Sequence, residues 1–372
     1  MRRAPLSRWR AAHVSHVRRQ GTSCGRLLHL QRGVNGRRRA GVSALVDVVF
    51  RGEADVSFPH FVDDYLAAGA RRECLDGLPL SSYPGLVTMR NGSAFAVQPI
   101  HHSESELAVF PPPDRSDFDH RAYQAASIAR VGEKVASVIT TYGCPFACDF
   151  CSKPVFGDTV RHRDLDGVFA EIDELRHLGY DAVWVADDTF TLRRVFVEDF
   201  CRRVRSRGMT WSCLSRASGV DADLASLMAA SGCRHVYLGL ESGCPATLAL
   251  MNKRATVAEG VRATQIYHEA GIAVGAFFMV GYPGEDVAAI EETFALALEL
   301  PLDEISFNVP MPLPGSRLYE RLGGRDATRD WTHENEITFV YDSEVDEVWL
   351  RRRVDETLAV FAERRAILSA SA

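Results

Sequence analysis

The chain has 372 residues, enough for two to three domains of about 150 residues each and for a substantial buried core. Its composition is that of an ordinary globular protein, and no run of about 18 apolar residues is present, which excludes a membrane-spanning helix. The net charge of −6 is uneven: residues 47–372 carry 32 Lys and Arg against 49 Asp and Glu, which gives no general reason to expect nucleic-acid binding.

The first 46 residues form a basic arm that contains 11 Arg, no Lys and no acidic residue. Such an arm is typical of a nucleic-acid or membrane-binding tail, of an organellar transit peptide, or of sequence outside the folded protein. Arg supplies 40 of the 43 basic residues of the chain, which suggests a GC-rich coding sequence in which a shifted frame also yields Arg, Gly and Ala. We therefore expect residues 1–46 to be disordered or non-native.

A single βα unit follows the arm. Residues 46–50 are apolar except for Asp47 and predict a strand, and the apolar spacing between Phe58 and Leu66 predicts a helix that ends near Gly69. One such unit cannot cover both edges of its strand, so it either docks on the main body or is the end of a larger domain. Residues 75–127, with three consecutive prolines in their middle, predict a mostly irregular connector.

From about residue 128 to residue 320, short β-branched or aromatic runs alternate with amphipathic helical patterns that end in glycine. The expected strands cover residues 135–141, 182–186, 209–214, 235–240, 272–280 and 304–309. Six alternating units predict an α/β fold with parallel strands, right-handed crossovers and helices on the sheet faces. An open sheet and a barrel both fit this pattern, and in both the ligands bind at the carboxyl ends of the strands.

The last part of the chain, residues 321–372, mixes charged turns with one helical pattern. Five apolar residues fall near one face of that helix: Val348, Leu350, Val354, Leu358 and Phe361. We therefore expect a small α-rich C-terminal region.

The chain has nine cysteines and no secretory signal, so a disulfide framework is not expected. Six are scattered and are expected to be small buried or incidental residues. The other three, Cys144, Cys148 and Cys151, form a C-x3-C-x2-C group directly after the first strand of the βα array. A structural zinc site normally takes four ligands from two separated pairs, and the sequence has no second pair. Three thiolates could instead hold a [4Fe-4S] cluster, in which one iron would remain open for chemistry. A zinc site or a redox-active thiol site is the alternative interpretation of the three cysteines.

This spacing, with the aromatic Phe150 before the last cysteine, resembles the signature of the radical S-adenosylmethionine (radical SAM) superfamily. The resemblance implies a partial (β/α)6 barrel of TIM type. It also implies a [4Fe-4S] cluster on the three cysteines, with SAM on the open iron through its amino and carboxylate groups. An external electron donor of flavodoxin or ferredoxin type would reduce the cluster, and SAM would then be cleaved to a 5′-deoxyadenosyl radical.

The resemblance extends to residues at the ends of the second and third strands. Asp187 or Asp188 would accept a charge-assisted hydrogen bond from the SAM ammonium, with helix capping by Asp188 as the alternative. Ser215 and Arg216 follow the third strand, and Arg216 would bind the SAM carboxylate unless it is a surface residue.

Two further matches lie after the fourth and fifth strands. Glu241, in a G-L-E-S-G segment, would reach SAM or its ribose, and Gly281 would let the backbone approach the adenine. Residues 312–319 are similar to a P-x-P-G-T-x-L-Y element of the same superfamily.

Together these motifs resemble the branch of the superfamily that carries an N-terminal cobalamin-binding domain, over about residues 45–320. Residues 47–53 are similar to the last strand and G-E turn of that Rossmann-like domain. The branch implies cobalamin as a cofactor. Because only the basic arm precedes residue 47, we expect residues 47–127 to be a remnant of that domain plus a connector.

By resemblance, the protein would be a cytoplasmic enzyme that methylates an unactivated carbon, or otherwise tailors a small-molecule or peptide substrate, with cobalamin. A cobalamin-independent cyclase, isomerase or oxidoreductase is the alternative, as is a truncated inactive family member. No motif names the substrate.

Overall fold

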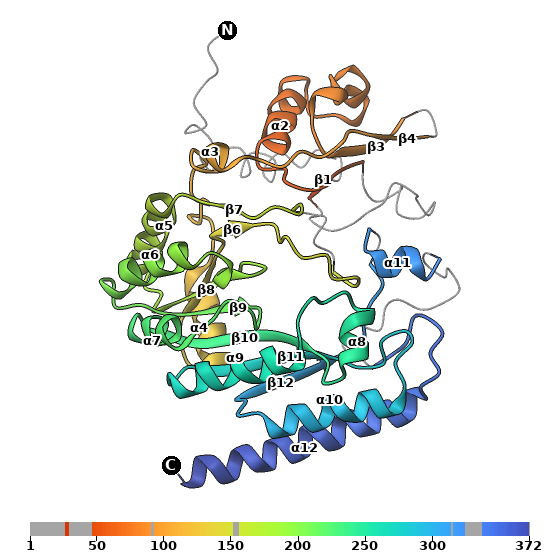
Figure 1. Cartoon of the computed structure of the whole chain (residues 1–372). Coiled ribbons are helices and arrows are strands. Elements are labelled where there is room, and N and C mark those ends of the chain that lie inside the picture. The colour runs from red at the N-terminus through yellow and green to blue at the C-terminus, as the bar shows by residue number, and fades with distance from the viewer. Residues whose placement is uncertain are drawn as a thin grey trace.

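The computed structural model describes residues 27–29, 47–90, 93–151, 156–313, 315–323 and 337–371. Figure 1 shows a small N-terminal sheet with one helix at one end of the molecule, a larger α/β core, and a long C-terminal helix along the opposite end.

The core contains a six-stranded sheet in which every pairing is parallel, in the order β12-β11-β10-β9-β8-β5. Its strands are β5 (Val135–Val138), β8 (Ala182–Val185), β9 (Thr210–Ser215), β10 (Cys233–Glu241), β11 (Ala273–Met279) and β12 (Glu304–Asn308). Each lies within or close to an expected strand, so the prediction of six parallel strands is confirmed. The sequential order leaves β5 and β12 as the two edges of the sheet, which matches a partial barrel.

Helices between consecutive strands cover the sheet (Figure 1). They are α5 (Leu165–His177), α6 (Arg194–Arg205), α7 (Ala222–Ala230), α9 (Val257–Glu269) and α10 (Val287–Glu299), with a short α8 (Pro245–Leu250) after β10. The side chains of Asp221 and Asp286 cap α7 and α10, and the expected capping box of Thr256 and Glu259 begins α9.

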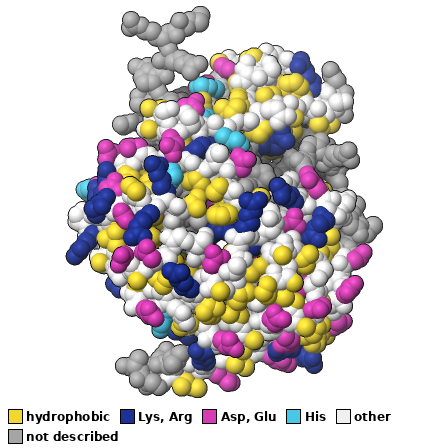
Figure 2. Space-filling view, in the orientation of Figure 1, with side chains coloured by type: hydrophobic (Ala, Val, Ile, Leu, Met, Phe, Trp, Pro, Cys, Tyr) yellow, Lys and Arg dark blue, Asp and Glu magenta, His cyan; other side chains and the backbone are white. Residues whose placement is uncertain are grey.

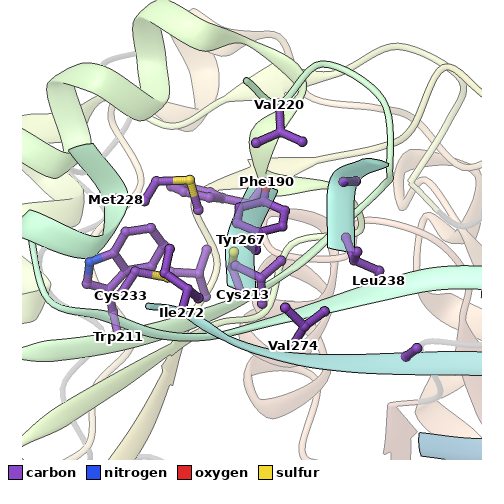
Figure 3. Close-up of a cluster of buried hydrophobic side chains, with 14 of the residues drawn as sticks. Phe190, Trp211, Cys213, Val220, Met228, Cys233, Leu238, Tyr267, Ile272 and Val274 are labelled. Atoms are coloured by element: carbon purple, nitrogen blue, oxygen red, sulfur yellow. The ribbon is translucent and has the colours of Figure 1, made fainter. Parts of the chain in front are cut away.

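The main core lies between this sheet and its helices (Figure 3). Phe190 and Trp211 pack edge to face at 5.5 Å, and the indole nitrogen of Trp211 donates to the Ser231 hydroxyl over 3.2 Å. Cys213 and Cys233 are buried in the same cluster. Both behave as the small apolar residues that the sequence predicted.

The N-terminal part forms a four-stranded sheet in the order β1-β2-β3-β4, comprising β1 (Leu27–His29), β2 (Val48–Phe50), β3 (Leu86–Arg90) and β4 (Ser93–Ala96). Strand β2 pairs in parallel with β1 and antiparallel with β3, and α2 (Ser57–Ala67) packs on the sheet through a cluster centred on Phe61. The expectation that the βα unit lacks edge partners is therefore wrong. Of the basic arm, which the sequence predicts to be disordered or non-native, Leu27–His29 form β1 and the rest lies outside the described residues.

The expectation of a mostly irregular connector is also wrong. Besides the β3–β4 hairpin, the segment contains η3 (Arg72–Gly77), η4 (Leu80–Ser82), α3 (Glu104–Leu107) and the start of α4 (His120–Val131). The turn before β3 depends on Gly85, which has φ 81° and whose added Cβ would lie 2.3 Å from the Arg51 carbonyl oxygen. An Asn-Gly pair between β3 and β4 in the sequence is a hairpin signal that the prediction of a connector did not take into account.

The C-terminal region contains α11 (Arg317–Arg321) and the 25-residue α12 (Glu347–Ser371), as the α-rich prediction required. Helix α12 lies beside α10 (Figure 1), joined by Arg353 and Glu291 at 2.7 Å. Leu350 and Val354 are buried, but Val348 is 75% exposed, so the expected apolar face is narrower than predicted. None of the described helices is long and apolar enough to cross a membrane.

Candidate cluster and cofactor site

The cysteine loop leaves a two-residue strand, β6 (Thr141–Tyr142), which pairs with β7 (Arg161–His162) farther along the chain. Gly143 makes the turn with φ 82°, and a Cβ there would lie 2.3 Å from the Thr159 carbonyl oxygen. The chain can enter the loop in this way only because the position is glycine. Figure 1 shows the loop between β6 and β7 running toward α8 and α11.

The three thiols of the loop are half-buried and unbridged. The Cys144 sulfur lies 4.0 Å from the Thr189 hydroxyl, and the Cys151 amide donates to the Cys148 carbonyl over 3.2 Å. Within the described parts of the chain, no group of three or more His, Cys, Asp or Glu side chains is arranged to hold a single metal ion.

Asp149, between the second and third cysteines, anchors the loop to two other segments. Its carboxylate accepts hydrogen bonds of 2.9 Å from the Tyr282 hydroxyl and from the Arg321 guanidinium. Its carbonyl oxygen accepts from the Leu318 amide over 2.9 Å. The loop after β11 and helix α11 are therefore attached to the cysteine loop, a contact that no motif in the sequence indicates.

The turn after α8, residues 251–254, holds the loop from another direction. The Met251 carbonyl accepts from the Asp149 amide over 2.8 Å, and the Asn252 side-chain amide donates to the Ala147 carbonyl over 2.7 Å. Phe150, predicted to bind cofactor, is half-buried against the apolar cluster of Met251, Tyr282 and Leu318.

Arg216 is buried beneath the cysteine loop. Its guanidinium carbon lies 3.7 Å from the centre of the Phe146 ring, and its Nη1 lies 3.6 Å from the Cys148 sulfur. Its Nη2 donates to the Lys253 carbonyl oxygen. Arg216 is therefore not the surface residue of the alternative interpretation, and its guanidinium spans the cysteine loop and the 251–254 turn.

Glu241 ends strand β10 in a strained conformation. Its φ is 67°, a region that non-glycine residues rarely adopt, and the register of the β10–β11 pairing shifts beside it. The Lys253 ammonium donates to the Glu241 carboxylate over 2.6 Å, and both side chains are buried. Gly239 gives this pair room, because an added Cβ would lie 2.6 Å from the Glu241 carboxylate oxygen. Lys253 was not among the predicted site residues.

A model of the radical SAM superfamily matches residues 138–297, from the end of β5 to α10, and this segment includes the cysteine loop. The chain carries a radical SAM domain. The family implies a [4Fe-4S] cluster and SAM as cofactors, as the resemblance predicted.

Among curated proteins, an uncharacterized methyltransferase of Pyrococcus horikoshii is 30% identical over 279 residues, which are 74% of this chain and 58% of that protein. The anaerobic magnesium-protoporphyrin IX monomethyl ester cyclase of Rubrivivax gelatinosus is 27% identical over 302 residues, 79% of this chain and 52% of the cyclase. The chain thus spans about half the length of the curated relatives it matches.

Two solved enzymes share the fold. The radical SAM methyltransferase TsrM from Kitasatospora setae, solved with cobalamin and a [4Fe-4S] cluster, has a TM-score of 0.62 at 18% identity, covering 76% of this chain and 55% of TsrM. The cobalamin-dependent radical enzyme OxsB, solved with aqua-cobalamin and SAM, has a TM-score of 0.56 at 14% identity, covering 69% of this chain and 37% of OxsB. The α/β radical SAM fold with its parallel sheet is thereby established.

The residues of the cysteine loop fit the cluster that the radical SAM domain implies. A [4Fe-4S] cluster takes one thiolate per iron, so its ligands need not converge on a single ion as zinc ligands do. Three unbridged, half-buried thiols on one loop, with a guanidinium beside one of them, supply such a donor set.

Of the two acidic residues predicted to bind SAM, Asp187 is already hydrogen-bonded within the protein. It is fully buried, and its carboxylate accepts from the Thr140 amide over 2.6 Å, from the Thr141 amide over 3.0 Å and from the Thr140 hydroxyl. Burial raises the pKa of Asp187, against these hydrogen bonds. Asp187 therefore joins the end of β8 to the segment that leads into the cysteine loop, and Asp188 is the exposed member of the pair.

Ser215 is likewise engaged within the radical SAM domain. Its buried hydroxyl contacts the Thr191 hydroxyl and donates to the Arg216 carbonyl over 3.0 Å. Ser215 therefore fixes the chain at the point where Arg216 turns toward the loop.

Gly281 is packed against the C-terminal region. It has φ 74°, and a Cβ there would lie 2.5 Å from the Phe339 ring. The Tyr341 hydroxyl donates to the Gly281 carbonyl over 2.8 Å. The glycine thus gives room to a protein side chain, where the sequence predicted room for the adenine.

Glu53, the glutamate of the predicted G-E turn, joins the N-terminal sheet to the radical SAM domain. The Arg161 guanidinium donates to both of its oxygens, at 2.6 and 2.8 Å, and the His102 amide donates over 2.8 Å. Burial alone would raise the pKa of Glu53, but the hydrogen bonds from Arg161 and His102 hold it below its usual range.

The described N-terminal residues do not by themselves fit cobalamin. A Rossmann-like domain is an open, mostly parallel sheet with helices on both faces. The described N-terminal sheet has one parallel pair, β1–β2, and two antiparallel pairings. No step of the chemistry is therefore assigned to cobalamin.

Proposed function

We propose that Cys144, Cys148 and Cys151 hold the [4Fe-4S] cluster of this radical SAM enzyme. The observation that carries the proposal is the preformed loop: three unbridged thiols lie on a segment held by Asp149, Arg216 and the turn after α8. When bound, the cluster supplies one electron that cleaves SAM and yields a 5′-deoxyadenosyl radical.

Two of the other predicted residues are proposed to bind SAM beside the loop. Glu241, paired with Lys253 at the end of β10, would accept hydrogen bonds from the SAM ribose. Asp188, exposed after β8, would accept from the SAM ammonium in place of Asp187. Arg216 would meet the SAM carboxylate only through movement of a guanidinium that now holds the loop.

For the reaction class, we propose methyl transfer to carbon in a small-molecule or peptide substrate. The support is that relatives from different organisms are named methyltransferases, including the Pyrococcus horikoshii protein, bacteriochlorophyllide d C-12(1)-methyltransferase and tryptophan 2-C-methyltransferase. The magnesium-protoporphyrin cyclases among the relatives favour a second candidate, hydrogen abstraction followed by cyclisation. Both reactions require an external one-electron donor, for which a flavodoxin or ferredoxin is proposed.

Anaerobic reconstitution with iron and sulfide tests the cluster. We expect about four iron atoms per chain, and 5′-deoxyadenosine when SAM and a one-electron reductant are added. Cys144→Ala, Cys148→Ala and Cys151→Ala should each lose the cluster and this product. Cys74→Ala is the matched control, because Cys74 is a half-buried thiol outside the loop. Cluster formation in Cys144→Ala at the wild-type level would contradict the proposal.

The reaction class is tested by the fate of the SAM methyl group. With methyl-labelled SAM and a library of candidate substrates, methyl transfer predicts label in the product and S-adenosylhomocysteine alongside 5′-deoxyadenosine. Label confined to methionine, with a substrate that loses hydrogen, would favour the cyclase candidate. A parallel titration with hydroxocobalamin measures whether the chain binds this cofactor.

A further inference from the structure

We infer that the turn after α8, residues 251–254, is a positioning element for the cluster, and that Asn252 is its principal positioning residue. The inference rests on the proposed cluster ligands. It concerns how the loop that carries them acquires its shape.

The turn contacts the cysteine loop at several points between the first and third cysteines. The side-chain amide of Asn252 donates to the Ala147 carbonyl over 2.7 Å, and the backbone N–H of Asp149 donates to the Met251 carbonyl over 2.8 Å. These bonds hold the residues on either side of Cys148. Arg216 adds a third link, because it donates to the Lys253 carbonyl while it lies against Phe146 and the Cys148 sulfur.

The backbone of the turn is in a costly conformation. Asn252 has φ 48° and Arg254 has φ 50°, so two non-glycine residues within three positions adopt the left-handed region. The end of helix α8 accounts for part of this left-handed conformation. The backbone N–H of Asn252 donates to the Ala249 carbonyl, and that of Lys253 donates to the Leu248 carbonyl. A helix end would accept glycine here, but glycine could not supply the side-chain donor that reaches Ala147.

The same turn also touches the predicted SAM site. Lys253 pairs with Glu241, which ends β10. In the sequence, Lys253 is two residues after Met251, whose carbonyl accepts the hydrogen bond from the cysteine loop. One short segment therefore fixes the cysteine loop and a buried carboxylate proposed for SAM. A displacement of the turn should change both cluster retention and SAM affinity.

The test compares Asn252→Asp with Gln124→Glu. Aspartate, like asparagine, tolerates the left-handed backbone conformation. In Asn252→Asp, however, a carboxylate oxygen replaces the side-chain NH2 group and faces the Ala147 carbonyl, to which it cannot donate. Gln124 is a matched control, because its side-chain amide donates to the Leu178 carbonyl over 2.9 Å, between α4 and the end of α5. Asn252→Gly removes the side chain and keeps the backbone conformation accessible.

Substitution of residues that hold metal ligands typically lowers metal affinity about 10- to 100-fold. We therefore expect Asn252→Asp and Asn252→Gly to lose iron to a chelator faster than the wild type, by a factor of about 10 to 100. We also expect a shifted reduction potential and an altered electron paramagnetic resonance spectrum of the reduced cluster. Gln124→Glu should match the wild type in all three measurements. Thermal unfolding of the cluster-free proteins shows whether each variant folds.

Wild-type iron loss, potential and spectrum in a folded Asn252→Asp variant would overturn the inference. The Cys144→Ala variant separates this outcome from failure of the proposed function. If Cys144→Ala lacks the cluster while Asn252→Asp behaves as the wild type, only the positioning role fails. If Cys144→Ala retains the cluster, the proposed ligands themselves are wrong.

Discussion

Glu285, in the loop after β11, is a buried carboxyl group whose charge the fold disfavours. It accepts hydrogen bonds from the Tyr282 amide over 3.0 Å and from the Thr247 hydroxyl over 3.1 Å. Burial, stronger than these hydrogen bonds, raises its pKa from 4.5 to about 7. A carboxyl group with a raised pKa in the folded state stabilises the protein at low pH, and this contribution is lost as the pH rises through the folded-state pKa.

The free energy of unfolding of the wild type should therefore fall, relative to Glu285→Gln, as the pH rises from 4.5 to about 7. The expected change in this difference is on the order of 3 kcal/mol, at about 1.4 kcal/mol per pKa unit. Urea unfolding of both proteins across this range measures it. Parallel pH profiles for the two proteins would show that Glu285 titrates normally in the folded state.

The residues proposed as cluster ligands could be predicted from their spacing, whereas residues defined by contacts across the fold could not. Cys144, Cys148 and Cys151 stand close together in the sequence, so their pattern is visible without a fold. Asn252 reaches Ala147 across 105 positions, and no local pattern marks such a pair. The resemblance to the superfamily predicts that Asp187 or Asp188 meets the SAM ammonium, whereas the carboxylate of Asp187 accepts hydrogen bonds from Thr140 and Thr141.

Among the elements, the C-terminal segment packs directly on the loop after β11. Gly281 accommodates the Phe339 ring, and the Tyr341 hydroxyl donates to its carbonyl. We expect Gly281→Ala to destabilise the protein by two effects, the left-handed φ of 74° and the overlap with Phe339. The first effect alone costs about 1–2 kcal/mol for a non-glycine residue.

Gly271→Ala isolates the second effect. Gly271 has φ 76°, and nothing lies within 4 Å of a Cβ added there. Gly281→Ala should therefore lower the free energy of unfolding by about 1–3 kcal/mol more than Gly271→Ala, the usual cost of overpacking. It should also speed proteolysis near residue 339. Equal destabilisation by the two substitutions would mean that Phe339 moves aside freely.

The strands and helices of the core were predictable from the spacing of their apolar residues. Strands β3 and β4 of the N-terminal sheet were not. Each core strand is an apolar run between helical patterns, which restricts the fold to a few parallel arrangements. Strands β3 and β4 are short and partly exposed, and they pair with each other, whereas only β3 pairs with β2. The pairing of β3 with β2 is a contact between segments distant in the sequence, and no alternation of apolar residues in 75–127 indicates it.

At the scale of the whole molecule, the charges of the described residues fall into two groups, those on the surface and those that are buried. Figure 2 shows acidic and basic side chains interspersed over the face in view. Three of the ion pairs that join separate segments of the chain are buried or partly buried. Arg115 and Arg163 both contact the Glu171 carboxylate beneath α5, and Arg161 and Glu53 join the N-terminal sheet to the core.

The Arg161–Glu53 pair should therefore determine how firmly the N-terminal sheet is attached to the radical SAM domain. Both side chains are buried, and Arg161 also donates to the His102 and Phe156 carbonyls. Glu53→Gln leaves the guanidinium without a counter-charge, which should cost about 3–5 kcal/mol. Glu198→Gln, which disrupts a surface pair with Arg194, should cost less than about 1 kcal/mol.

Limited proteolysis should cleave Glu53→Gln between the N-terminal sheet and β5 before the core unfolds. Because Glu53 contacts β7, which pairs with the strand that enters the cysteine loop, loosening of the sheet should also slow cluster reconstitution. The double variant Glu53→Gln/Arg161→Gln should recover part of the lost stability, since no unpaired buried charge remains. Additive losses in this double-mutant cycle, or proteolysis identical to Glu198→Gln, would show that the buried pair does not hold the sheet to the core.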